Sequence, residues 1–137
     1  MTRTARWWAL GGGAALVALL WWPATTRQGV DFRQRTILQP LYLKAMDFIS
    51  RDGHYRLLAR EIVQGAATDE ARALQIYAWT RDHIRPVPPG LPVVDDHIWH
   101  IIIRGYGTDD QVNDVFTTLC AYAGLSAFWD WLSTPEQ

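Results

Sequence analysis

The sequence lacks several features that would indicate particular classes of protein. It has one cysteine, Cys120, which excludes an intrachain disulfide. The formal charge of −1, without a basic stripe interleaved with aromatic residues, gives no indication of nucleic-acid binding. No internal repeat or low-complexity segment is evident. The 49% hydrophobic content, with eight tryptophans, argues against disorder, and a length of 137 residues allows one domain at most.

A stretch without charge runs from Trp7 to Pro23, behind a short basic head. Tryptophan pairs lie at both of its ends, where a membrane span would place an aromatic belt. As a helix the stretch would be about 25 Å long, slightly short of the ~30 Å hydrocarbon core of a bilayer. We therefore expect a basic head and transmembrane signal-anchor over residues 1–26, with the lipid bilayer as a partner. A cleavable signal peptide is the alternative.

The following residues predict a juxtamembrane linker and then helices. Residues 27–39 are polar and charged, without helical periodicity, and indicate the linker. Apolar residues at helical spacing predict one helix from Pro40 that ends at Gly53, and a second over residues 54–64. Thr68 is expected to cap a third helix, which Pro86 ends.

The C-terminal half is expected to contain a connector, two helices and one strand. The prolines of residues 86–92 exclude regular secondary structure there. Asp95 or Asp96 is expected to cap a short helix that extends to Ile103. In residues 126–132 Ala127, Trp129 and Trp131 alternate with Phe128 and Leu132, and the segment is rich in aromatic side chains, which predicts a strand.

The segment between Gly105 and Phe116 is the most informative part of the chain. Thr108, followed three residues later by Gln111, predicts a capping box, in which each side chain satisfies an unpaired backbone N–H. Asp109 and Asp110 would then lie in the first helical turn, where the helix dipole favours negative charge. Apolar spacing predicts a helix that begins near Asp109 and ends before Gly124, with Cys120 as a buried structural thiol.

These motifs, in this order, resemble the transglutaminase-like superfamily, which shares its core with papain-type cysteine proteases. The resemblance covers roughly residues 71–132, through segments 73–85, 94–97, 105–111 and 123–127. It implies a mainly α fold, an α+β remnant, in which residues 40–137 form the helical half of a transglutaminase-like domain ending in one β-strand. A protein partner could complete the missing sheet.

The resemblance also locates the position of the catalytic nucleophile. In bacterial members the turn commonly reads Gly-Tyr-Gly-x-Cys-Asp-Gln, so the cysteine falls at Asp109. Its neighbours in the motif are Gly107, Thr108, Asp110 and Gln111. A carboxylate is a poor nucleophile towards an unactivated amide, whereas the superfamily relies on a thiolate.

The other two members of the triad are also expected to be absent. The superfamily's histidine and aspartate lie on strands that follow this helix, but only residues 133–137 come after Leu132. We therefore expect neither catalytic residues nor a cofactor. Asp109→Cys alone should not restore amidase or protease activity.

Several functions remain open. The first is a membrane-anchored, non-catalytic domain with a binding or structural role in the cell envelope, its soluble part outside the cytoplasm, as the resemblance implies. The second is a truncated remnant, or a split half, of a cysteine amidase, protease or transglutaminase. The third is residual hydrolase or amidase activity.

A metal-binding helical module is a further alternative. His97 and His100 are three residues apart on an expected helix, so they could share a face and bind one ion together with Asp96. Asp95 and Asp96, however, are already explained as helix caps. These residues are therefore weak candidates.

Overall fold

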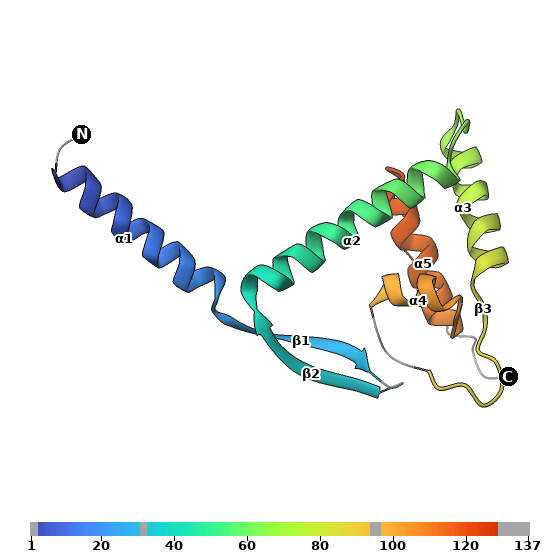
Figure 1. Ribbon diagram of the computed structural model, residues 1–137. Helices are drawn as coiled ribbons and strands as arrows, with labels where there is room; N and C mark the ends of the chain where they lie inside the picture. The colour runs from blue at the N-terminus through green and yellow to red at the C-terminus, as the bar shows by residue number, and fades with distance from the viewer. Residues whose placement is uncertain (1–2, 31–32, 94–96, 129–137) are drawn as a thin grey trace, which may run out of the picture. The chain divides into compact units, whose positions relative to one another are not determined.

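The computed structural model describes residues 3–30, 33–93 and 97–128, which are mainly helical (Figure 1). Two compact units divide the chain, Met1–Ser50 and Arg51–Gln137. The boundary falls within a helix. The elements, in order, are α1 (Arg3–Leu20), β1 (Pro23–Val30), β2 (Arg33–Pro40), α2 (Leu41–Ile62), α3 (Asp69–His83), β3 (Arg85–Pro86), α4 (Ile98–Arg104), β4 (Tyr106–Gly107) and α5 (Asp109–Tyr122).

The N-terminal unit contains a β-hairpin where the sequence predicts a linker. β1 and β2 pair antiparallel without interruption, from Pro23 opposite Pro40 to Val30 opposite Arg33. The prediction of a linker over residues 27–39 did not include this pairing. Pairing between the two strands satisfies their backbone groups, and helical periodicity carries no information about such pairing.

No described helix is both long enough and apolar enough to cross a membrane. The transmembrane helix expected from Trp7 to Pro23 is thus unsupported. Its charge-free stretch does not form a single helix, because α1 begins at Arg3 in the basic head and ends at Leu20, while Pro23 already begins β1.

α2 continues through Gly53, where the sequence predicts a break between two helices. Glycine in a helix costs about 1 kcal/mol relative to alanine, a penalty that neighbouring interactions can offset. Here an ion pair at i, i+4 spans the glycine, with Arg56 Nε 2.7 Å from a carboxylate oxygen of Asp52. The left-handed glycine that follows α2 is Gly65, at φ 83°.

α3 and α5 pack together in the C-terminal unit, and α4 packs on α5. The buried apolar residues form one cluster, drawn from four helices and the residue after α3. They are Tyr55, Ile76, Ile84, Ile101, Val115, Leu119 and Cys120. The cluster fixes the direction of α5 and so the place where its N-terminus lies.

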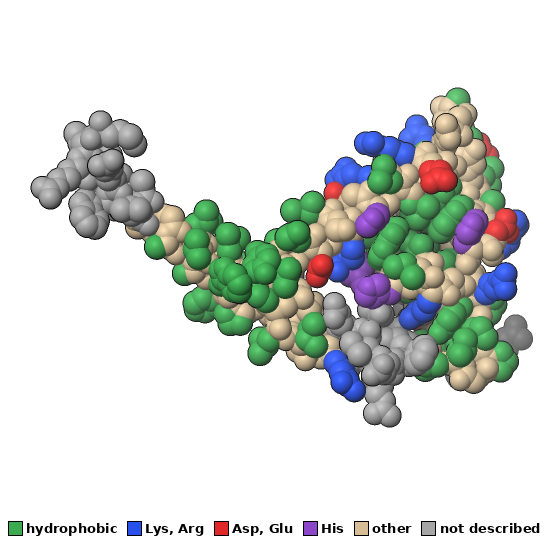
Figure 2. All heavy atoms as spheres, in the orientation of Figure 1, with side chains coloured by type: hydrophobic (Ala, Val, Ile, Leu, Met, Phe, Trp, Pro, Cys, Tyr) green, Lys and Arg blue, Asp and Glu red, His purple; other side chains and the backbone are tan. Residues whose placement is uncertain are grey.

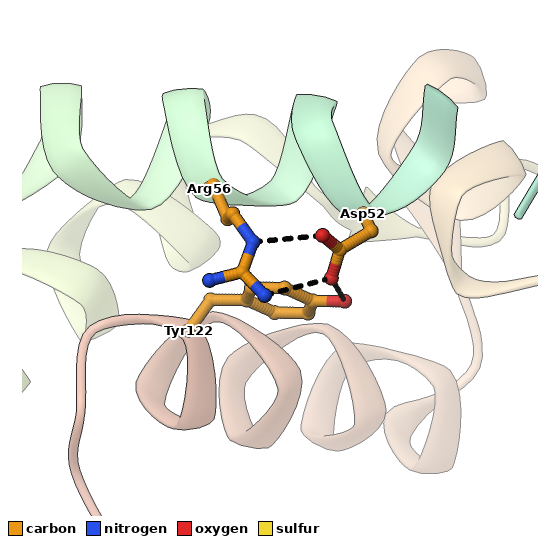
Figure 3. A network of polar contacts seen from close by, with 3 residues as sticks. All are labelled: Asp52, Arg56 and Tyr122. Carbon is orange, nitrogen blue, oxygen red and sulfur yellow. Dashed lines mark hydrogen bonds and ion pairs between the residues drawn. The ribbon is translucent and has the colours of Figure 1, made fainter. Parts of the chain in front are cut away.

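A polar network joins α2 to α5 at the edge of this cluster (Figure 3). The Tyr122 hydroxyl donates to Asp52 Oδ1 at 3.0 Å, and the Arg56 guanidinium lies 5.8 Å from the centre of the Tyr122 ring. Hydrogen bonds from Arg56 and Tyr122 lower the pKa of Asp52, because they stabilise its charged form.

Two of the expected helix starts are confirmed, and a third lies elsewhere. Thr68 caps α3 by accepting a hydrogen bond from the Ala71 N–H at 3.2 Å. The capping box of Thr108 and Gln111 is present at the start of α5. The cap of α4 is His97, whose Nδ1 accepts from the Trp99 N–H at 3.2 Å. Residues 95 and 96, predicted as caps, lie outside the described residues.

The expected C-terminal strand is not formed where the chain is described. Gly124, at φ 82°, follows α5, and the Leu125 N–H returns to the Cys120 carbonyl at 2.9 Å. Residues 126–128 have no strand conformation, and residues 129–132 lie outside the described part. Leu125 and Ala127 pack against the apolar cluster, so tertiary burial and not strand pairing accounts for their apolar pattern.

Candidate functional site

The site is centred on the turn that leads into α5. Gly105 adopts the left-handed conformation, at φ 72°, and ends α4. Gly107 leaves no room for a side chain, because a Cβ there would lie 3.0 Å from Gln111 Cβ and 3.3 Å from Ile101 Cγ2. The two glycines therefore allow the chain to turn tightly around Gln111.

Gln111 is buried and acts as the centre of this turn. Its Oε1 accepts one hydrogen bond from the Thr108 N–H at 3.3 Å and another from Arg104 Nη2 at 2.7 Å. Arg104 Nε donates to the Tyr106 carbonyl at 2.9 Å. Arg104, which the sequence analysis did not single out, thus joins the end of α4 to the start of α5. Its place directly before the Gly-Tyr-Gly turn is the only local sign of this role.

Asp109 is the first residue of α5 and lies at the edge of a cavity of about 510 Å³. The side chains that line it come from α3, from α5, from β3 and from the residue between α3 and β3. They are Tyr77, Thr80, Arg81, Ile84, Pro86, Asp109, Val112, Asn113 and Phe116. The rings of Tyr77 and Phe116 meet edge to face, with centroids 6.4 Å apart. Most of the lining is apolar, and a few polar groups lie among it.

Thr80 is the most informative of these polar groups. Its residue is 2% exposed, and its hydroxyl has no hydrogen-bond partner among the described residues. A buried hydroxyl without a partner costs free energy, about 1–3 kcal/mol by protein mutational data. Thr80 therefore places a buried hydroxyl without a partner in the wall of the cavity. The sequence placed Thr80 on an expected helix but gave no sign of this role.

Asp109 and Asp110 both lie in the first turn of α5, as the sequence predicts. Asp109 is exposed and lines the cavity, whereas Asp110 does not line it. Asp109 forms no ion pair with any described residue. The cationic residue of the lining, Arg81, is paired with Asp82 at 2.9 Å.

Comparison with known protein families assigns this part of the chain to a family. The sequence model of the transglutaminase-like superfamily matches residues 56–129, more than half of the chain. The chain belongs to the transglutaminase-like superfamily. The match includes the Gly-Tyr-Gly turn, the whole of α5 and the helix α3 that packs on it. Neither the curated proteins nor the solved structures include a significant match to the chain.

The one cysteine of this transglutaminase-like chain is far from the turn. Cys120 lies eleven residues after Asp109 on the same helix, about 16 Å along its axis. It is 1% exposed, as the sequence predicts for a structural thiol, and burial raises its pKa. A buried thiol with a raised pKa does not supply the thiolate that the superfamily's chemistry uses.

The weak metal candidates occupy structural positions on α4. His97 caps that helix, and its Nδ1 also lies 3.3 Å from the Tyr55 hydroxyl. The His97 and His100 rings have centroids 6.4 Å apart. Within residues 3–30, 33–93 and 97–128, no three His, Cys, Asp or Glu side chains gather as metal ligands would. Asp96 lies outside these ranges.

Proposed function

We propose that this protein is a non-catalytic transglutaminase-like domain that binds a polypeptide segment in the cavity beside Asp109. The observation that carries the proposal is the side chain at the start of α5. A carboxylate occupies the position at which the superfamily motif has its nucleophilic thiol. Attack by a carboxylate on an amide would form an anhydride and expel an amine, which is a poor leaving group.

Cys120 supports the non-catalytic part of the proposal. A displaced nucleophile would need to be accessible and to have a lowered pKa. Cys120 is buried, and desolvation shifts its pKa in the opposite direction. The capping box and the Arg104–Gln111 contact nevertheless keep the turn ordered, so the surroundings of the former nucleophile position remain able to recognise a ligand.

The lining of the cavity supports a polypeptide ligand. Ligand pockets are mostly apolar with a few placed polar groups, and typical volumes are about 300–1,000 Å³. This cavity has two aromatic rings, the unpaired Thr80 hydroxyl, and an amide and a carboxylate from α5. A peptide matches this mixture because it carries apolar side chains together with backbone donors and acceptors.

Catalysis is tested directly on the purified protein. Ammonia release and amine incorporation are measured with a glutamine-containing peptide, with and without added primary amine. We expect neither above the buffer rate. Turnover that disappears in Asp109→Asn or Cys120→Ser would refute the non-catalytic assignment.

Binding is tested by selecting peptides from a displayed random library and measuring their affinities. We expect Tyr77→Ala to weaken the selected peptides about tenfold or more, because it removes one aromatic wall of the cavity. Leu74→Ala, on the same face of α3 but outside the cavity lining, is the matched control and should leave affinity unchanged. Thr80→Val should also weaken binding. Equal effects of Tyr77→Ala and Leu74→Ala would show that the peptides bind elsewhere.

We further propose that the N-terminal unit attaches the protein to a membrane and that the transglutaminase-like part lies outside the cytoplasm. In support, the described side chains of α1 and the turn after it are exposed and largely apolar, including Leu16, Val17, Leu19, Trp21 and Trp22. Exposed apolar patches of this kind mark contact sites for membranes or proteins. Cell fractionation tests the attachment. Recovery of the intact chain in the soluble fraction alone would contradict it.

A further inference from the structure

The first part of α2 carries apolar side chains that the N-terminal unit does not cover. Tyr42, Met46 and Ile49 follow one another at helical spacing of four and three residues, so they lie on one face of the helix. Met46 is 61% exposed and Ile49 67% exposed. A soluble helix would normally turn such a face towards a core.

This face is continuous with the tryptophan pair that follows α1. The Leu41 N–H donates to the Trp22 carbonyl at 2.9 Å, and the Trp21 and Tyr42 rings have centroids 5.4 Å apart. Trp21 and Trp22 are themselves mostly exposed. We call the surface formed by Trp21, Trp22, Tyr42, Met46 and Ile49 the aromatic–aliphatic face. Figure 2 shows hydrophobic side chains gathered where α1 ends and α2 begins.

The unit that carries this face is basic. The N-terminal unit, Met1–Ser50, contains six Arg or Lys and two Asp in its sequence, a formal charge of +4. Arg27, Arg35 and Lys44 are exposed, and Lys44 Nζ donates to the Thr25 carbonyl at 2.7 Å, which places this cation beside the start of β1. The N-terminal unit therefore exposes both tryptophan and basic side chains, the two kinds of side chain that the headgroup region of an anionic bilayer attracts.

We propose that the aromatic–aliphatic face is a second membrane contact, in addition to α1, and that it lies against the headgroup layer of an anionic bilayer. The proposal rests on the membrane attachment proposed above and extends it to α2 and to a class of lipid. Charge complementarity selects anionic lipid over a second copy of the chain, because two units of charge +4 would repel each other at a shared face.

The test uses the full chain with a nitroxide or fluorophore attached at Met46→Cys or Ile49→Cys. Cys120 is buried and serves as the unreactive background, which is checked on the unlabelled wild type. Leu74→Cys, comparably exposed but in the C-terminal unit, is the matched control. Accessibility to a water-soluble quencher is measured with phosphatidylcholine vesicles and with vesicles that also contain phosphatidylglycerol.

We expect anionic vesicles to protect the labels at residues 46 and 49 several-fold from the quencher, and the label at residue 74 not at all. Protection should decrease at high salt, because the contribution of exposed charges is screened. If the protein sediments with vesicles but all three labels remain equally accessible, the second contact is refuted and the attachment by α1 stands. If the protein sediments with neither kind of vesicle, both proposals fail. Protection that appears without vesicles and grows with protein concentration would assign the face to a second copy instead.

Discussion

The two units of this chain carry opposite charges and differ in whether their described residues include buried apolar side chains. The N-terminal unit has a formal charge of +4, whereas the C-terminal unit has seven Arg and twelve Asp or Glu, a charge of −5. Among described residues, every buried apolar side chain belongs to the C-terminal unit. The N-terminal unit instead presents tryptophan, methionine and isoleucine to its surroundings.

α2 shows this difference within a single helix. Its residues Met46 and Ile49 are exposed, while Tyr55 and Ala59 are buried. One helix therefore exposes apolar side chains in the N-terminal unit and buries others in the C-terminal unit. A chain that is nearly neutral in total thus combines a basic unit without buried apolar side chains, among its described residues, with an acidic unit that encloses an apolar cluster.

The largest expected change in the free energy of unfolding comes from removing a buried side chain of the C-terminal unit. Removal of an exposed side chain of the N-terminal unit is the comparison. Leu119→Ala removes a fully buried side chain and should lower the free energy of unfolding by about 2–5 kcal/mol. Ile49→Ala should change it by no more than about 0.5 kcal/mol, because the side chain is mostly exposed. Chemical denaturation followed by circular dichroism measures both. Comparable losses would show that Ile49 also packs in a core.

A smaller effect tests how much the hydrogen bonds of the turn before α5 contribute to the stability of the C-terminal unit. Gln111→Ala leaves the Thr108 N–H and Arg104 Nη2 without their acceptor and should cost about 1–3 kcal/mol. Thr108→Ala removes only the other half of the capping box and should cost about 1 kcal/mol. Thermal unfolding of the two variants shows which substitution causes the larger loss of stability. The reverse order would mean that the Arg104 contact contributes little.

The smallest effect concerns the dependence of stability on pH. The folded-state pKa of Asp52 is lowered, chiefly by Arg56, so its carboxylate stabilises the fold above its ordinary pKa of 3.8. That stability is lost as the pH falls through the lowered pKa. Asp52→Asn should therefore be less stable than the wild type at neutral pH and approach it in acid, as urea titrations at several pH values would measure. Asp47→Asn, in the N-terminal unit, is the control, and an identical pH profile for both variants would contradict the role of the network.

Residues near one another in the chain account for what the sequence analysis predicted correctly. Thr68 and Thr108 cap their helices, and the motif from Gly105 to Gln111 indicated the superfamily, because caps and turns depend on neighbours within a few residues. Cys120 was predicted to be buried from its place on the apolar side of α5.

Contacts between distant residues account for what was missed. The break predicted at Gly53 fails because Tyr55, two residues further along α2, packs in the apolar cluster against residues of α3, α4 and α5. The hairpin of β1 and β2 was missed because each strand needs the other to satisfy its backbone. Arg104 can donate its hydrogen bond to Gln111 only because the glycine turn brings the two side chains together.

The amino-acid sequence by itself determined the superfamily, the start of α5 and the presence of a carboxylate, Asp109, at the first position of that helix. These features depend on residue identity and on hydrogen bonds within one turn of the chain. Only the tertiary structure decided that the Thr80 hydroxyl is buried beside Asp109 in a cavity and that the start of α2 remains uncovered. Both depend on which surfaces of separate helices meet, and the periodicity of a single helix does not determine its partner.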